Sequence, residues 1–261
     1  MSILRHVVKK FNLMRTLFRL FIFSIFLISC ESKEKELTAQ QIIDESIAVS
    51  GANKIPNSLL SFDFRDRTYI ANRNKGKFSL QRITKQNDTV ITDILSNDGF
   101  SRLINEKPTS VIDSMAVKYS ESINSVHYFS VLPYGLNDGA VKKKLLESVK
   151  IKEKEYHKVQ ITFAQEGGGI DFDDVFIYWI GKEDFQIDYM AYTFHVNGGG
   201  KRFREVRKEH LVNGIRFTDH NNYKPEDSNT DLFQLDQLFE NGQLKKLSEI
   251  NLENIIISFN N

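Results

Sequence analysis

Residues 201–223, KRFREVRKEHLVNGIRFTDHNNY, form two strand-like runs joined at Asn213-Gly214. Asn-Gly is favoured at a two-residue hairpin turn because both central residues of a type I′ turn need positive φ. Strands joined this tightly run antiparallel, since a parallel pair needs a long crossover connection. The stretch therefore predicts an antiparallel hairpin and argues against α/β-barrel and Rossmann folds.

Strand-like runs continue on both sides of this hairpin. They are LLSFDFRDRTYI, GKFSLQRIT and DTVITDIL before residue 96, and LLESVKIK, YHKVQITFA, DVFIYWIG, FQIDYMAYTFHV and LKKLSEINLENIIISF from residue 145 onward. Turn-forming residues separate them, among them Asn97-Asp98-Gly99. The run DVFIYWIG is apolar at consecutive positions, which is typical of a strand covered on both faces. Successive strands without crossover helices predict an antiparallel meander.

Helices are predicted at the start of the domain and in its middle. The first begins at the capping-box pattern Thr38–Gln41 and ends at Gly51. Residues 110–132 carry apolar residues at three- and four-residue spacings and stop at Pro133. A short helix is also expected around residues 140–145. The fold class is therefore α+β, with a large curved antiparallel sheet and a helical insertion that covers one face.

The N-terminus has the features of a secretory signal peptide. Residues 17–29 are almost wholly apolar and follow Arg15, and the apolar core is about half as long as the roughly 20 residues of a spanning helix. The motif Leu27-Ile28-Ser29-Cys30 resembles the bacterial lipobox, in which the cysteine receives a diacylglyceryl group and signal peptidase II cuts before it. We expect Cys30 to tether the protein to a membrane through acyl groups.

These features divide the chain into a signal peptide (1–29), a lipidated, solvated tether (30–36) and a single domain (37–261). Met14 begins a well-proportioned signal by itself, in which case residues 1–13 are not translated. Removal of residues 1–29 leaves 30 basic against 34 acidic residues, a net charge of −4. A mildly acidic body gives no reason to expect nucleic acid as a partner.

Motifs for catalysis or metal binding are absent from the sequence. The only cysteine is Cys30, which excludes an intramolecular disulfide and a multi-cysteine metal site. The histidines are dispersed without an HExxH pattern, and neither a G-x-S-x-G elbow nor a P-loop occurs. We therefore expect no metal, no cofactor and no identifiable catalytic residue.

Two triple-glycine connections are the candidate ligand site. EGGGIDFDD (166–174) has glycines followed by aspartates, as calcium-binding glycine repeats do. Those repeats work as stacked arrays, so a single copy favours a plain hairpin connection. A second triple glycine, 198–200, lies two strands later, so both turns are expected at one edge of the sheet. Their acids and bases would fix the loops to each other or receive a polar ligand group. The candidate ligand-binding residues are Asp171, Asp174, Trp179, Tyr192, Arg202 and Arg204.

The motifs HYFSVLPYGLND, EGGGIDFDDVFIYWI, DYMAYTFHVNGGGKRFRE and NGIRFTDHNNYKP resemble a family of uncharacterised envelope lipoproteins of flavobacteria and their relatives. More loosely, the order of elements is similar to the LolA/LolB-like lipoprotein carriers. That resemblance implies an unclosed β-barrel that wraps around helices and encloses an apolar cavity for acyl chains. Twenty phenylalanines and nine tyrosines are enough to line such an interior.

The resulting hypothesis is a lipid-anchored cell-envelope protein, expected at the outer membrane. It would be non-catalytic and would bind a hydrophobic ligand, either a lipid or an acylated protein, in the half-barrel. One alternative is an enzyme with a polar site at the glycine-rich edge, carried by Asp171, Asp174, Arg202 and Arg204. The other is a structural or assembly lipoprotein of the outer membrane.

Overall fold

The computed structural model describes residues 36–167, 172–195 and 198–260. The predicted signal peptide, the alternative start at Met14 and the lipobox cysteine Cys30 lie outside these residues. The chain divides into two compact units, Met1–Leu37 and Thr38–Asn261, and the second holds every element named below. No helix of the described residues is both long and apolar enough to cross a membrane.

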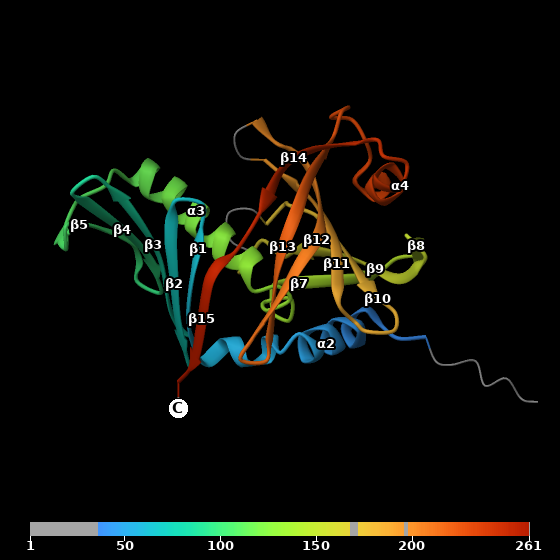
Figure 1. The fold of residues 1–261 in the computed structure, drawn as a ribbon, viewed down its shortest axis with the longest axis horizontal. Coiled ribbons are helices and arrows are strands. Elements are labelled where there is room, and N and C mark those ends of the chain that lie inside the picture. Colours follow the sequence, from blue (N-terminus) through green and yellow to red (C-terminus); the bar gives the residue numbers. More distant parts are fainter. Residues whose placement is uncertain (1–35, 168–171, 196–197, 261) are drawn as a thin grey trace, which may run out of the picture. The chain divides into compact units, whose positions relative to one another are not determined.

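Strands are the predominant regular structure of this second unit (Figure 1). The helices are α2 (Ala39–Val49), η1 (Ala52–Asn57), α3 (Asp113–Ser130), η3 (Leu232–Gln234) and α4 (Leu235–Glu240). The strands are β1 (Ser58–Phe64), β2 (Arg67–Asn74), β3 (Lys77–Gln86), β4 (Thr89–Ser96), β5 (Gly99–Ile104), β6 (Lys107–Pro108), β7 (Val141–Leu145), β8 (Val149–Ile151), β9 (Lys154–Phe163), β10 (Phe176–Gly181), β11 (Ile187–Phe194), β12 (Gly200–Val212), β13 (Ile215–Pro225), β14 (Leu244–Ile250) and β15 (Glu253–Phe259).

The strands form two open antiparallel sheets. The first has the order β15-β1-β2-β3-β4-β5-β6, and the second has the order β14-β13-β12-β11-β10-β9-β7, with β8 also paired to β9. The two sheets are connected through β14 and β15, which lie at an edge of the second and the first sheet respectively. The predicted α+β class with an unclosed antiparallel sheet is confirmed. The strands are hydrogen-bonded as two separate sheets and not as one continuous sheet.

Local signals fixed the hairpin and the first helix. Asn213 and Gly214 have φ values of 50° and 74°, as the type I′ turn requires. Thr38 and Gln41 form the predicted capping box, with each side chain bonded to the other's backbone N–H. Helix α2 ends at Val49 with Ser50 as its C-cap. The next residue is Gly51, whose φ is 69° and whose missing side chain leaves room for the Gly214 carbonyl. The hairpin turn therefore packs directly against the end of α2.

Several predicted boundaries are wrong. The run LLSFDFRDRTYI is two strands, because Arg65 adopts positive φ and reverses the chain between β1 and β2. The run LKKLSEINLENIIISF also divides, and its halves join different sheets. The helix expected at residues 140–145 is strand β7, whose alternating side chains and pairing with β9 satisfy the backbone in an extended conformation. Helix α4, a six-residue segment, was not predicted.

Helix α3 covers one face of the first sheet and reaches the second. It contacts β3, β4 and β5, and Ile123 is buried in the cluster formed with the first sheet and β13. Its last turn places Phe129 5.0 Å from the ring of Tyr192 in β11. A second cluster lies where η3 and α4 cover the other face of the second sheet. Every residue of β10 is buried, which confirms that this strand is covered on both faces.

Candidate functional site

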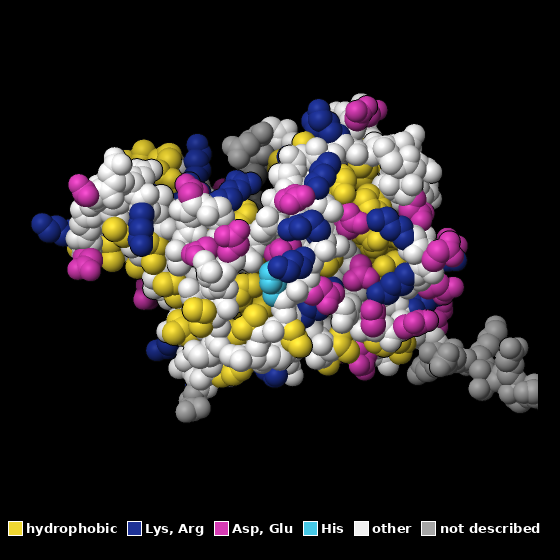
Figure 2. Space-filling model, in the orientation of Figure 1, with side chains coloured by type: hydrophobic (Ala, Val, Ile, Leu, Met, Phe, Trp, Pro, Cys, Tyr) yellow, Lys and Arg dark blue, Asp and Glu magenta, His cyan; other side chains and the backbone are white. Residues whose placement is uncertain are grey.

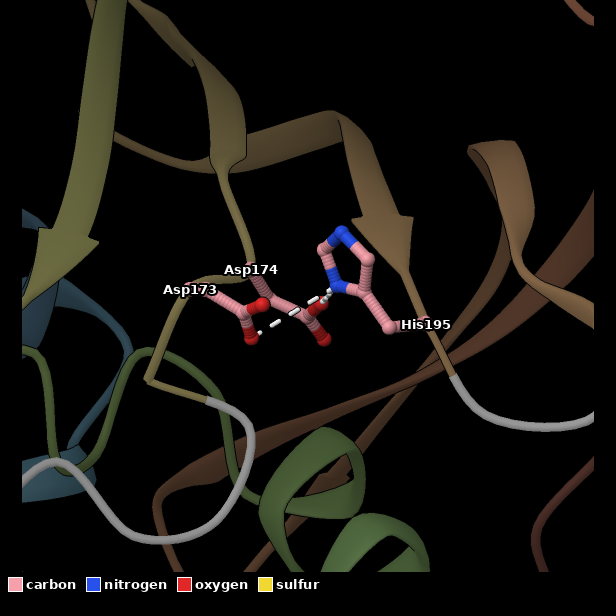
Figure 3. Close-up of side chains that lie close together, drawn as sticks. All are labelled: Asp173, Asp174 and His195. Atoms are coloured by element: carbon pink, nitrogen blue, oxygen red, sulfur yellow. Dashed lines mark hydrogen bonds and ion pairs between the residues drawn. The ribbon is translucent and has the colours of Figure 1, made fainter.

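The two triple-glycine connections lie at the same edge of the second sheet, because β10 and β12 both pair with β11. Figure 3 shows Asp173 and Asp174, at the entry of β10, facing His195 at the exit of β11. His195 Nδ1 lies 2.9 Å from Asp174 Oδ1 and 3.5 Å from Asp173 Oδ1. This contact confirms that the connections are neighbours. The candidate residue Asp171 lies outside the described residues.

The basic residues of the second connection direct their hydrogen bonds elsewhere. Lys201 Nζ donates to the Ser228 carbonyl (2.8 Å), and Arg202 Nη1 donates to the Lys201 carbonyl (2.8 Å). Arg204 is buried, and its Nη2 donates to the Tyr192 hydroxyl (2.7 Å). The structure thus places a histidine, His195, beside the two acids, and the sequence had not placed this residue in the site.

Asp173, Asp174 and His195 form a compact set of oxygen and nitrogen atoms. One donor atom of each lies within 4.8 Å of the others, so the set could hold a divalent cation. Alternatively, the Asp174 carboxylate orients the imidazole, which could then take up or release a proton. Asp174 is mostly buried, whereas Asp173 and His195 are exposed. His195 directly follows β11, at the start of the second triple-glycine connection. The predicted proximity of the two connections could therefore have identified it as a neighbour of the acids.

The remaining candidates lie on opposite faces of the second sheet. Trp179 points toward α4, where its Nε1 donates to Asp236 (3.0 Å). Tyr192 points the other way and stacks on Phe176 with ring centroids 5.3 Å apart. Alternate residues of a strand face opposite sides, so Phe176 and Trp179 of β10 cannot share a surface. Trp179 therefore lies on the opposite face of the sheet from Tyr192, and the five described candidates do not share one surface.

Aromatic side chains pack the interior between α3 and the second sheet. Tyr128 and Phe129 of α3 meet Phe176 and Tyr178 of β10, and the two tyrosine hydroxyls lie 3.1 Å apart. Burial raises the pKa of Tyr128 to about 12. Both hydroxyls therefore stay protonated at neutral pH and serve each other as hydrogen-bond partners. This part of the interior is a packed core.

A cavity of about 300 Å³ lies beside that core, between the first sheet and the end of α3. Its lining comes from η1, β2, β3, α3 and the turn after α3: Pro56, Arg73, Gly76, Lys77, Phe78, Leu80, Asn124, His127, Tyr128, Val131, Tyr134, Gly135 and Asp138. Apolar and aromatic side chains line it together with polar and charged ones, which are Arg73, Lys77, Asn124, His127 and Asp138. This combination is typical of small-molecule sites.

Two of these polar residues are deeply buried. Arg73 is 7% exposed, and its guanidinium lies 5.4 Å from the ring centroid of Tyr134. His127 is fully buried, and its Nε2 lies 3.1 Å from the Gln81 carbonyl. Burial lowers the pKa of His127 to about 4, with a smaller contribution from the positive charge of Arg73. The ring is therefore neutral at pH 7.

Sequence reasoning missed this cavity, although one signal for Arg73 was present. Tyr69, Ala71 and Arg73 alternate along β2, and all three face the interior. An arginine in register with buried residues indicates either an internal ion pair or a ligand contact. His127 occupies a comparable inward position on α3.

A second, more polar hollow of about 580 Å³ lies between β12 and the junction of β14 with β15. Asp219 is buried beside it and accepts a hydrogen bond from the Leu252 N–H (2.9 Å), while His210 Nε2 lies 3.0 Å from its other oxygen. Basic and acidic side chains are mixed over the face seen in Figure 2. The hollow is therefore less suited than the first cavity to an apolar ligand.

Known structures with a similar arrangement include a LolA superfamily protein from Nitrosomonas europaea. Its sequence identity is 10% and its TM-score is 0.47, and the alignment covers 87% of this chain and 95% of that chain. A DUF1329 family protein from Desulfovibrio piger is 7% identical with a TM-score of 0.43, covering 86% and 94%. The Mycobacterium tuberculosis lipoprotein LppX is 10% identical with a TM-score of 0.28, covering 60% and 89%.

The search of curated proteins gives no match. A family model does match, over residues 15–252, which include both glycine connections, all of α3 and the whole lining of the cavity. The chain therefore belongs to DUF6503, a family of unknown function.

Proposed function

We propose that this chain is a lipid-anchored, non-catalytic protein of the cell envelope that binds a hydrophobic ligand in the cavity lined by Arg73 and His127. The observation that carries the proposal is the lining of that cavity. Phe78, Leu80 and Val131 supply aliphatic and aromatic surface, and Tyr134 closes one side. Transfer of an apolar chain from water onto such surface contributes about 25 cal/mol per Å².

The volume of the cavity limits the ligand. About 300 Å³ is at the lower end of the roughly 300–1,000 Å³ typical of ligand sites. Such a space accepts a single acyl chain or a small amphiphile. Among the ligands that an envelope protein meets, one chain of a lipid or of an acylated protein fits this limit.

The anchoring part of the proposal rests on the lipobox. A lipidated Cys30 would hold the domain at a membrane surface, where free and protein-bound acyl chains are concentrated. The charged segment 31–36 would keep the domain in water while the acyl groups remain in the bilayer. We place the protein at the outer membrane.

Photoaffinity labelling tests the ligand class. Full-length chain in native membrane vesicles is irradiated with two probes that share a C12 tail and a diazirine, one ending in an alcohol and the other in a carboxylate. We expect at least one probe to label peptides that contain Phe78 or Val131. Val131→Phe fills the cavity and should remove this labelling, whereas Val117→Phe, on the exposed side of α3, should preserve it. Equal labelling in the two variants would refute ligand binding in this cavity.

A further inference from the structure

Among the residues that the structure describes, Arg73 is a buried cation without a counter-charge. Its Nη1 is buried and has no hydrogen-bond partner within residues 36–167, 172–195 and 198–260, and no ion pair in those ranges includes it. Burial accordingly lowers the pKa of Arg73. A guanidinium keeps its charge in proteins, so this position carries a desolvated positive charge.

Two other buried cations of the described residues have the carboxylate partner that Arg73 lacks, and a third, Arg204, has no ion pair there but donates to the Tyr192 hydroxyl. Arg82 Nη2 lies 2.6 Å from Asp93, and Lys158 Nζ lies 2.6 Å from Asp236. Removing a charge from water costs several kcal/mol unless a partner compensates it. The difference points to a partner for Arg73 from outside the described chain.

The surroundings of Arg73 leave an anion room to bind. The acid in the lining of the cavity is Asp138, which is exposed and has no ion pair with Arg73 in the described residues. Desolvation raises the pKa of Asp138, and the positive charge of Lys143 only partly opposes this shift. The other buried polar residue of the lining is His127, whose Nε2 must carry the proton because the Gln81 carbonyl can only accept. Its Nδ1 is therefore a buried acceptor, also without a partner in the described part of the chain. Two unsatisfied polar groups thus line one cavity.

We propose that this cavity recognises an amphiphile through its anionic end, a carboxylate or a phosphate bound by the guanidinium of Arg73. The inference rests on the proposed function and names the chemical class of its ligand. The fork of an arginine donates two parallel hydrogen bonds to a carboxylate or phosphate. The apolar tail would lie along Phe78, Leu80 and Val131, and Nδ1 of His127 would accept from a ligand hydroxyl.

The same pair of photoreactive probes tests this inference. A hydrogen bond to a charged group changes affinity by about tenfold or more, so the wild-type cavity should be labelled about tenfold more efficiently by the carboxylate than by the alcohol. Arg73→Met should remove that preference while alcohol labelling persists, which also shows that the cavity is still formed. Lys77→Met is the matched control, because Lys77 lines the same cavity but is exposed; its carboxylate labelling should stay within about twofold.

Other outcomes separate the possible failures. Equal labelling of wild type by both probes, or equal losses in Arg73→Met and Lys77→Met, would overturn anion recognition and leave hydrophobic binding intact. Absence of labelling by either probe would overturn the proposed function itself. Dodecyl phosphate should compete with the carboxylate probe, and inorganic phosphate should not. Competition by inorganic phosphate alone would assign the site to a free anion and overturn the amphiphile. If Arg73→Met loses alcohol labelling, Arg73→Gln provides the same comparison.

Discussion

Replacing Arg73 by methionine should make the ligand-free protein more stable. Methionine is flexible enough to fill the space of the arginine stem without bringing a buried charge. An unpaired buried polar group costs about 1–3 kcal/mol, and the contact with Tyr134 returns about 0.5–1 kcal/mol. The net gain for Arg73→Met is therefore about 0.5–2 kcal/mol in the free energy of unfolding.

Arg82→Met is the opposite case and serves as the control. Arg82 is equally buried, but the variant removes a charged hydrogen bond to Asp93, worth about 1.5–3 kcal/mol. Arg102, whose Nε lies 2.6 Å from Asp93, remains as a partner and limits the loss. Both substitutions therefore remove a guanidinium group from the first sheet. Arg73→Met is expected to raise the free energy of unfolding, and Arg82→Met is expected to lower it.

Thermal unfolding followed by circular dichroism or calorimetry measures both variants. For a chain of this size 1 kcal/mol corresponds to about 2–4 °C in Tm, so Arg73→Met should raise Tm by about 1–8 °C and Arg82→Met should lower it by about 3–12 °C. Bound ligand must first be removed by delipidation, because an anion on Arg73 would stabilise the wild type alone. A decrease in Tm for Arg73→Met similar to that of Arg82→Met would falsify the assignment of Arg73 as an unpaired cation.

Three further predictions concern stability. The pKa of His127 is about 4 in the folded chain against 6.5 for the free residue, so protonation favours unfolding and His127 should contribute a fall of about 2 kcal/mol in the free energy of unfolding between pH 7.5 and 5. Buried His220, with a pKa of about 3, should contribute a similar fall of about 2 kcal/mol. Asp236→Asn leaves Lys158 buried without its counter-charge and should cost about 3–5 kcal/mol in urea unfolding. Gly51→Ala places a Cβ 2.0 Å from the Gly214 carbonyl at positive φ, which should cost about 2 kcal/mol or more.

Each of these predictions has a control. His127→Gln should reduce the slope of the stability profile between pH 5 and 6.5 by about half, since His220 supplies the rest, and an unchanged slope would contradict the buried neutral His127. The double variant Lys158→Met with Asp236→Leu should recover at least half of the loss caused by Asp236→Asn, unless the pair stabilises the fold by its own attraction. Gly99→Ala shares a positive φ but meets no atom within 4 Å, so it should cost clearly less than Gly51→Ala.

The sequence predicted part of the candidate site. The glycine connections were correctly placed at one edge, because strand order within a meander follows from successive hairpins. Their charged partners were not, since Arg204 lies in the interior with Tyr192, and His195 takes its place beside Asp174. Which side of a strand a residue faces follows from register, and a shift of a single residue reverses it. Strand boundaries inferred from residue patterns are not accurate to a single residue, so they do not predict which face of the sheet a side chain occupies.

By itself the sequence determined the features that depend on neighbouring residues. The turn at Asn213-Gly214, the capping box of α2 and the helical spacing of α3 each express conformational preferences within a few residues. They required no knowledge of distant partners, because the backbone geometry of glycine and the hydrogen bonds of a helix end act locally. From them the antiparallel α+β class followed.

Only the tertiary structure decided what those elements enclose. Strand β15 pairs with β1 from the other end of the chain, and residues 141–145 become a strand because the edge of β9 supplies hydrogen bonds that a short helix could not. The cavity with Arg73 and His127 gathers residues from Pro56 to Asp138. Its burial and unmatched charge arise when these distant segments pack together and exclude water, an event that no local pattern records.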